Sequence, residues 1–136
     1  MELARLYNYL YQQSSREYMI IFSLDGYDEV SLTSDFKYIL NGVEQIVSPE
    51  KMNYKKVLPS ELNGGRSISE AGDLFMKIIK GEGTKTQNNV VTINSQMALK
   101  CYYPAKSFEE CREIASESLL SRKAYKSFIK LIELQS

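Results

Sequence analysis

One short segment restricts the fold more than any other part of the chain. Residues 18–22 (Tyr-Met-Ile-Ile-Phe) are apolar without interruption, which is typical of a strand that a parallel sheet buries on both faces. A single parallel-type strand cannot form a sheet by itself. We therefore expect the chain to be a piece of a larger α/β fold.

The segments around this strand predict a helix before it and a hairpin after it. Apolar side chains recur at helical spacing over residues 3–11, so the chain is expected to begin with an amphipathic helix. Residues 35–40 and 43–47 flank Asn41-Gly42. This pair suits a type I′ turn because both central residues need a positive φ.

The second half predicts about four helices. A capping box from Ser67 to Glu70 begins the first helix and Gly81 ends it. Residues 81–89 are expected to form a looser segment. The stretch that follows has a β-branched start, which fits either a helix or a strand. Pro104 ends this stretch. A second capping box begins at Ser107. The side chains expected to face inward are Ile68, Ala71, Phe75, Ile78 and Ile79 in the first helix, Phe108, Cys111, Ala115 and Leu119 in the third, and Ala124, Phe128, Leu131 and Ile132 in the last.

These elements predict a single partial α/β domain over residues 1–136. Residues 1–62 hold the helix, the strand, an acidic turn and the hairpin, and residues 63–136 form a helical layer. No internal repeat, low-complexity tract or clear linker divides the chain.

Composition excludes several kinds of function. Lysine and arginine number 17, as do aspartate and glutamate, so we expect neither nucleic acid nor a membrane as partner. The chain has no histidine, which rules out a Ser–His or Cys–His nucleophile pair within it. Two cysteines without further ligands make a zinc site unexpected and indicate a reduced, cytoplasmic protein.

The residues best suited to metal binding or catalysis directly follow the apolar strand. They read Asp25-Gly26-Tyr27-Asp28-Glu29, and ligands bind at the carboxyl ends of strands in open α/β sheets. Asp28 and Glu29 are predicted to bind one magnesium ion or to bridge two, since magnesium takes one or two protein carboxylates and completes its shell with water and phosphate. Acidic residues are also common in turns. On spacing alone, an ordinary turn is favoured over a magnesium site.

Two further features have weaker chemical meaning. Asn63-Gly64-Gly65 precedes the Ser67 cap, and free amides at a helix start can bind phosphate. A glycine pair before a cap is usually only a turn. The last helix carries Arg122, Lys123, Lys126 and Lys130, which we interpret as a solvated face.

Taken together, four blocks resemble the C-terminal half of anthranilate phosphoribosyltransferase, over nearly the whole chain. The blocks are Ser23-Leu24-Asp25-Gly26-Tyr27-Asp28-Glu29-Val30-Ser31, Leu62 with Gly64-Gly65 and Ala71, Asn94 within the Val90–Leu99 segment, and Ser107-Phe108-Glu109-Glu110 with Ser121-Arg122-Lys123-Ala124. The first is similar to the family's His-Gly-x-Asp-Gly-x-Asp-Glu block. Each block alone is weak, and their shared order makes the resemblance specific.

The resemblance implies the nucleoside phosphorylase/phosphoribosyltransferase-like α/β fold. It also implies transfer of phosphoribosyl from phosphoribosyl pyrophosphate to anthranilate, with magnesium assisting pyrophosphate departure. Asp28 and Glu29 are then the metal pair. The departures from the family pattern are Phe22 and Ser23 for its usual histidine and glycine, Arg66 for an acidic residue, and Ser95 for alanine.

The resembled family also has segments that this chain lacks. Neither its Gly-Thr-Gly-Gly-Asp phosphate loop nor its Lys-His-Gly-Asn anthranilate segment occurs in the 136 residues. We expect a truncated gene product, a proteolysed chain or a cloned fragment, inactive by itself. The family's homodimer is not expected, because its N-terminal helices are mostly missing, whereas self-association through an open sheet edge is.

Two alternatives stay open at this point. One is a non-catalytic remnant or interaction module of the same fold. The other is a relative of the pyrimidine nucleoside phosphorylases, which share the wider fold.

Overall fold

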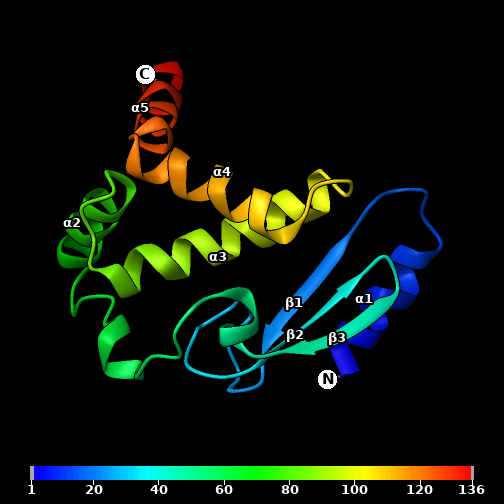
Figure 1. Ribbon diagram of the computed structural model, residues 1–136. Helices are drawn as coiled ribbons and strands as arrows, with labels where there is room; N and C mark the ends of the chain where they lie inside the picture. The colour runs from blue at the N-terminus through cyan, green and yellow to red at the C-terminus, as the bar shows by residue number, and fades with distance from the viewer. Residues whose placement is uncertain (1, 136) are drawn as a thin grey trace.

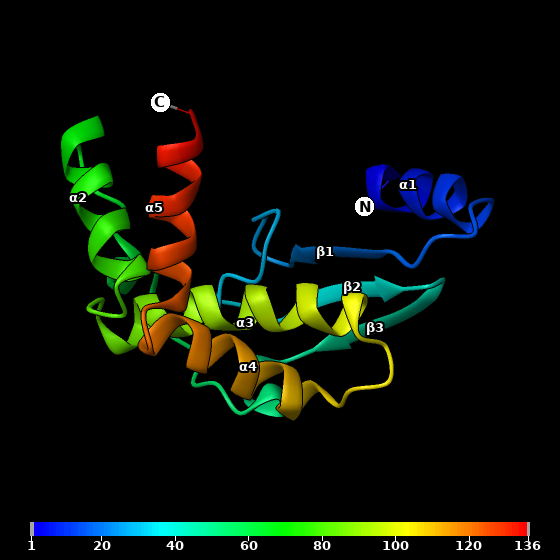
Figure 2. The same ribbon diagram turned by 90° about the horizontal axis from the view of Figure 1, so that it is seen from above.

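The computed structural model describes residues 2–135, in which a small sheet lies between helices (Figures 1 and 2). Helix α1 (Glu2–Gln12) precedes strand β1 (Met19–Ser23), and β2 (Phe36–Leu40) and β3 (Val43–Val47) follow it. The strands are antiparallel in the order β1-β2-β3. Strand β1 contacts α1 and the long helix α3, which lie on opposite sides of the sheet (Figure 2).

The rest of the described chain is helical. Two short 3-10 turns, η1 (Pro49–Met52) and η2 (Pro59–Leu62), lead into α2 (Ile68–Ile79), α3 (Lys85–Tyr102), α4 (Phe108–Leu120) and α5 (Lys123–Gln135). Helices α3 and α4 run side by side along one side of the sheet, while α2 and α5 stand together at the end far from the hairpin (Figure 2). The expectation of a hairpin followed by about four helices is met. No described helix is both long and apolar enough to cross a bilayer.

The hairpin has the predicted turn. Asn41 has a φ of 48° and Gly42 a φ of 84°, the two positive values that a type I′ turn requires. The Asn41 side chain also accepts a hydrogen bond from the Tyr18 backbone amide at 3.0 Å. This bond attaches the turn to the segment that enters β1.

Strand β1 differs from its prediction. Its residues 19–22 are half-buried, and only Ser23 is buried. The reason is its place in the sheet, since β1 pairs with β2 along one edge and has no strand on its other edge within residues 2–135.

The hydrophobic core lies between the sheet and α3. Phe36 of β2 and Ile93 of α3 are completely buried. The Tyr54 hydroxyl donates to the Gln96 side chain at 2.9 Å, and that amide donates to the Phe108 carbonyl at 3.0 Å, so these two buried side chains are paired. The core cluster consists of Val30, Leu32, Phe36, Val47, Met52, Tyr54, Ile93 and Met97.

The helix starts confirm one capping box in full and another in part. At α4 the Ser107 and Glu110 side chains each accept the other's backbone amide, at 3.1 and 2.7 Å. At α2 the Ser67 hydroxyl accepts the Glu70 amide, but the Glu70 carboxylate accepts the Arg66 amide instead of that of Ser67.

The prediction of a looser segment over residues 81–89 is wrong from Lys85 onward, because α3 begins there. Thr84 caps this helix and forms a reciprocal capping box with Gln87. The β-branched residues 90–93 therefore lie inside a helix, where packing of Thr92 and Ile93 outweighs their lower helix propensity.

The faces of α2 and α5 predicted to point inward are buried only in part, since Ile78, Ile79, Ala124 and Phe128 are half-buried. Ile68 is 94% and Phe75 46% exposed in α2, and Leu131 is 53% and Ile132 45% exposed in α5. The two helices touch through an edge-to-face contact of Phe75 with Phe128, with ring centroids 5.0 Å apart.

The free edge of β1 leads to a prediction about association. Unpaired backbone groups on an exposed strand edge favour pairing with another chain, so we expect the chain to self-associate, with a sedimentation coefficient that rises with concentration. An Ile20→Lys variant, which places a charge on this strand, is expected to associate less. A sharply monomeric profile of the unaltered chain at high concentration contradicts this prediction.

Candidate functional site: the acidic loop after strand β1

Ser23, the last residue of β1, organises the acidic loop. Its hydroxyl donates to the Glu29 carbonyl at 2.7 Å and accepts the Ser31 amide at 3.0 Å. Its backbone amide donates to the Tyr27 carbonyl at 2.8 Å. The serine that replaces the family's usual glycine thus closes the loop with three hydrogen bonds.

Asp25 is engaged inside the loop. Its carboxylate accepts hydrogen bonds from the hydroxyls of Ser31 and Thr33. Gly26 next to it has a φ of 98°, a conformation that favours glycine. We infer that the Asp25 side chain holds the turn together.

Asp28 and Glu29 differ from Asp25 in having no such engagement. Both residues are exposed, and neither carboxylate makes a hydrogen bond or ion pair within residues 2–135. The two side chains border different hollows. Asp28 borders the one between α1 and β1, with Tyr7 and Phe22.

Glu29 borders a second hollow, on the side of α2 and α3. The Asn63-Gly64 segment and Ser31 border the same space. The structure therefore brings Glu29 next to the glycine loop, and places Asp28 on another side of the turn. The two carboxylates border no hollow in common, so this geometry does not bring them together around a single ion.

The donor chemistry of the loop fits magnesium. The described residues contain no group of three or more His, Cys, Asp or Glu side chains suited to a metal. Magnesium does not need one, because it usually takes one or two carboxylates and fills its shell with water and phosphate oxygens. Two exposed carboxylates on a loop fixed by its own hydrogen bonds meet that requirement.

Asn94 of α3 ties the loop to the helical half. Its Oδ1 accepts the Val30 amide at 3.0 Å, and its Nδ2 donates to the Val30 carbonyl at 3.0 Å and to the Val90 carbonyl at 2.9 Å. The sequence analysis named Asn94 as part of a block that resembles the family, but it predicted no contact for this residue. Sixty-four residues separate it from Val30, so no local spacing could have predicted this contact.

The glycine loop before α2 offers little for phosphate binding by itself. The Arg66 amide donates to Glu70 at 2.6 Å, and the Gly65 amide donates to the Asn63 side chain at 3.2 Å. These amides are thus already paired within the protein, which supports the interpretation as a turn.

The cationic residues predicted on the last helix are partly neutralised, and the first of them, Arg122, lies just before α5. Arg122 pairs with Glu82 at 2.8 Å and Lys123 with Glu117 at 2.5 Å. The latter contact lowers the pKa of the Glu117 carboxyl, through the hydrogen bond from Lys123 first and its charge second. Lys126 and Lys130 are exposed. These features agree with a solvated face.

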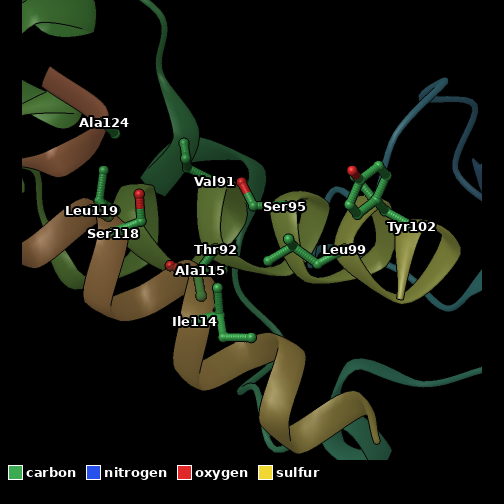
Figure 3. A pocket seen from close by; sticks show the side chains of 11 residues that line it. Val91, Thr92, Ser95, Leu99, Tyr102, Ile114, Ala115, Ser118, Leu119 and Ala124 are labelled. Atoms are coloured by element: carbon green, nitrogen blue, oxygen red, sulfur yellow. The ribbon is translucent and has the colours of Figure 1, made fainter. Parts of the chain in front are cut away.

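A separate apolar hollow lies between α3 and α4 (Figure 3). Val91, Ser95 and Leu99 of α3 face Ile114 and Leu119 of α4 across it. None of the acidic-loop residues borders it, and no sequence pattern predicted it.

Comparison with known proteins shows which family the whole chain resembles. No model of a protein family matches the chain. Anthranilate phosphoribosyltransferase of Bacteroides fragilis is 42% identical over 132 residues, 97% of this chain, and that of Flavobacterium johnsoniae is 43% identical over 138 residues, 98% of this chain. The resemblance to anthranilate phosphoribosyltransferase is confirmed. The chain spans about 40% of the length of these relatives.

Solved structures support the same fold. The anthranilate phosphoribosyltransferase of Thermus thermophilus aligns with a TM-score of 0.69 and 23% identity, covering 80% of this chain and 32% of that one. The enzyme of Saccharomyces cerevisiae, in complex with phosphoribosyl pyrophosphate and magnesium, aligns with a TM-score of 0.76 and 20% identity, covering 93% and 36%. The predicted class, a fragment of the phosphoribosyltransferase-like α/β domain, is confirmed. These relatives are anthranilate phosphoribosyltransferases and not pyrimidine nucleoside phosphorylases.

Proposed function

We propose that this chain forms the acidic, metal-binding part of an anthranilate phosphoribosyltransferase. In this proposal the complete enzyme transfers phosphoribosyl from phosphoribosyl pyrophosphate to the amine of anthranilate, a step of tryptophan biosynthesis. The observation that carries the proposal is the 42% identity over 97% of the chain to a curated enzyme of that activity. The exposed Asp28 and Glu29 on a fixed loop agree with it.

In the proposed mechanism, Asp28 and Glu29 would hold magnesium. The ion, when bound, supplies positive charge that stabilises the departing pyrophosphate. The remaining contributions come from the loop itself, whose backbone is held by Ser23 and Asn94. This preorganisation fixes the backbone that carries the carboxylates before the substrate binds, so the loop needs little reorganisation during the reaction.

The proposal extends to the organisation of the protein. We treat residues 1–136 as a single partial domain, because the core joins Phe36 of the sheet to Ile93 of the helical layer. Two free cysteines, Cys101 and Cys111, agree with a reduced, cytoplasmic protein. Its small-molecule partners are phosphoribosyl pyrophosphate and anthranilate, and we expect the isolated chain to be inactive.

Reconstitution tests the proposal. The chain is co-expressed with the upstream part of the Bacteroides fragilis relative, which covers the length that this chain does not match. The assembled pair is expected to consume phosphoribosyl pyrophosphate only when anthranilate is added, while each part alone does not. A correctly assembled pair without activity contradicts the proposal and favours a non-catalytic remnant.

A further inference from the structure

The side chain of Asn94 makes an unusual pair of contacts with one residue of the acidic loop. It accepts from the Val30 amide and donates to the Val30 carbonyl, both at 3.0 Å. A primary amide is suited to this pairing because it carries a donor and an acceptor side by side. The contact reproduces the pattern by which one strand residue pairs with another.

The surroundings make this contact hard to replace. Val30 is completely buried, so water has little access to its backbone groups, and buried backbone groups need partners. A third bond, from Asn94 Nδ2 to the Val90 carbonyl at 2.9 Å, stays within α3 and fixes the orientation of the amide. Ile93 next to Asn94 is also completely buried in the core, which holds this turn of α3 in place.

The position of Val30 connects the contact to the proposed chemistry. It directly follows Glu29, whose own carbonyl accepts the Ser23 hydroxyl at 2.7 Å. The backbone after the carboxylate pair is therefore held from two sides, by β1 through Ser23 and by α3 through Asn94. A shift of Val30 would turn Glu29 first and Asp28 next.

We propose that Asn94 is a positioning residue, which fixes Val30 and thereby directs Asp28 and Glu29 toward magnesium and diphosphate. This inference rests on the proposed function. Asn94 does not touch the reacting atoms in this account, and its effect is transmitted by the loop backbone.

The test compares Asn94→Ala and the milder Asn94→Ser with Asn88→Ala. Asn88 is a matched control because its amide, in the same helix, also donates to loop carbonyls, those of Gly81 and Gly83 at 3.3 Å. Calorimetric titration of the reconstituted pair with magnesium and pyrophosphate measures affinity. Hydrogen–deuterium exchange at Val30 measures whether the loop has been released.

We expect both Asn94 variants to weaken magnesium–pyrophosphate binding by about tenfold or more and to speed exchange at Val30, while Asn88→Ala stays within about twofold in affinity. Added to Asp28→Asn/Glu29→Gln, Asn94→Ala should cause no further loss, because it acts through those carboxylates. A purely structural role would lower the melting temperature without these two patterns.

The outcomes separate this inference from the proposed function. Wild-type affinity in both Asn94 variants, beside a loss in Asp28→Asn/Glu29→Gln, overturns the positioning role alone. Unchanged affinity in Asp28→Asn/Glu29→Gln, or no binding by the unaltered pair, overturns the metal assignment and the positioning role with it.

Discussion

Replacing both loop carboxylates, Asp28→Asn with Glu29→Gln, is expected to lower turnover of the reconstituted enzyme by at least about 100-fold. Metal stabilisation of a leaving group is worth several kcal/mol, and about 1.4 kcal/mol corresponds to a tenfold change in rate. The fold should survive, because both residues are exposed and such surface changes usually alter stability by no more than about 0.5 kcal/mol. The measurement is the initial rate of pyrophosphate release across a magnesium series.

A charge-matched control accompanies this variant. Asp73→Asn with Glu113→Gln removes two acids that are also exposed, on α2 and α4, and is expected to leave the rate unchanged. If the loop variant retains wild-type turnover at every magnesium concentration, its carboxylates are not the metal ligands.

The second large effect concerns stability. Phe36→Ala is expected to lower the free energy of unfolding by about 3–5 kcal/mol, since it removes a fully buried aromatic side chain and leaves a cavity. Phe36 has no exposed surface, and in the sheet it lies opposite Ser23 and Val47. A domain of this size has only about 5–15 kcal/mol of stability, so a substantial part would be lost.

Urea unfolding followed by circular dichroism measures this difference. Phe75→Ala, at a ring that is 46% exposed on α2, removes the same atoms from a surface position and should cost clearly less. Equal losses in the two variants contradict the assignment of the core to the space between β2 and α3.

Local sequence patterns predicted the features that depend on neighbouring residues. The Asn41-Gly42 turn and the Ser107 capping box formed as expected because each is decided within about four residues. Thr84 and Gln87 also form a capping box. The start of α3 could therefore have been predicted from the sequence, although a looser segment was predicted there.

Other features depend on what lies across the fold. The apolar run in β1 suggested burial on both faces, but its burial is decided by the strands beside it. Ile68 and Leu131 follow the helical periodicity of their stripes and are nonetheless exposed. Periodicity predicts which side chains share a face, and does not say whether another element covers that face.

The candidate site shows the same division. The sequence predicted that Asp28 and Glu29 follow a strand in a turn, and the structure agrees. It did not predict that Glu29 shares a hollow with Asn63 and Gly64, or that Asn94 holds Val30. Both arrangements join segments far apart in the chain, and tertiary packing alone creates them.

The metal assignment is most directly tested by locating the ion. Manganese prefers the same oxygen ligands as magnesium and broadens the NMR signals of nearby nuclei. With manganese and pyrophosphate, the isotope-labelled chain in the reconstituted pair is predicted to lose amide signals first at residues 27–30, while Lys130 in α5 stays sharp. The Asp28→Asn/Glu29→Gln variant should keep all of these signals. Broadening that is centred elsewhere, or that persists unchanged in this variant, contradicts the account.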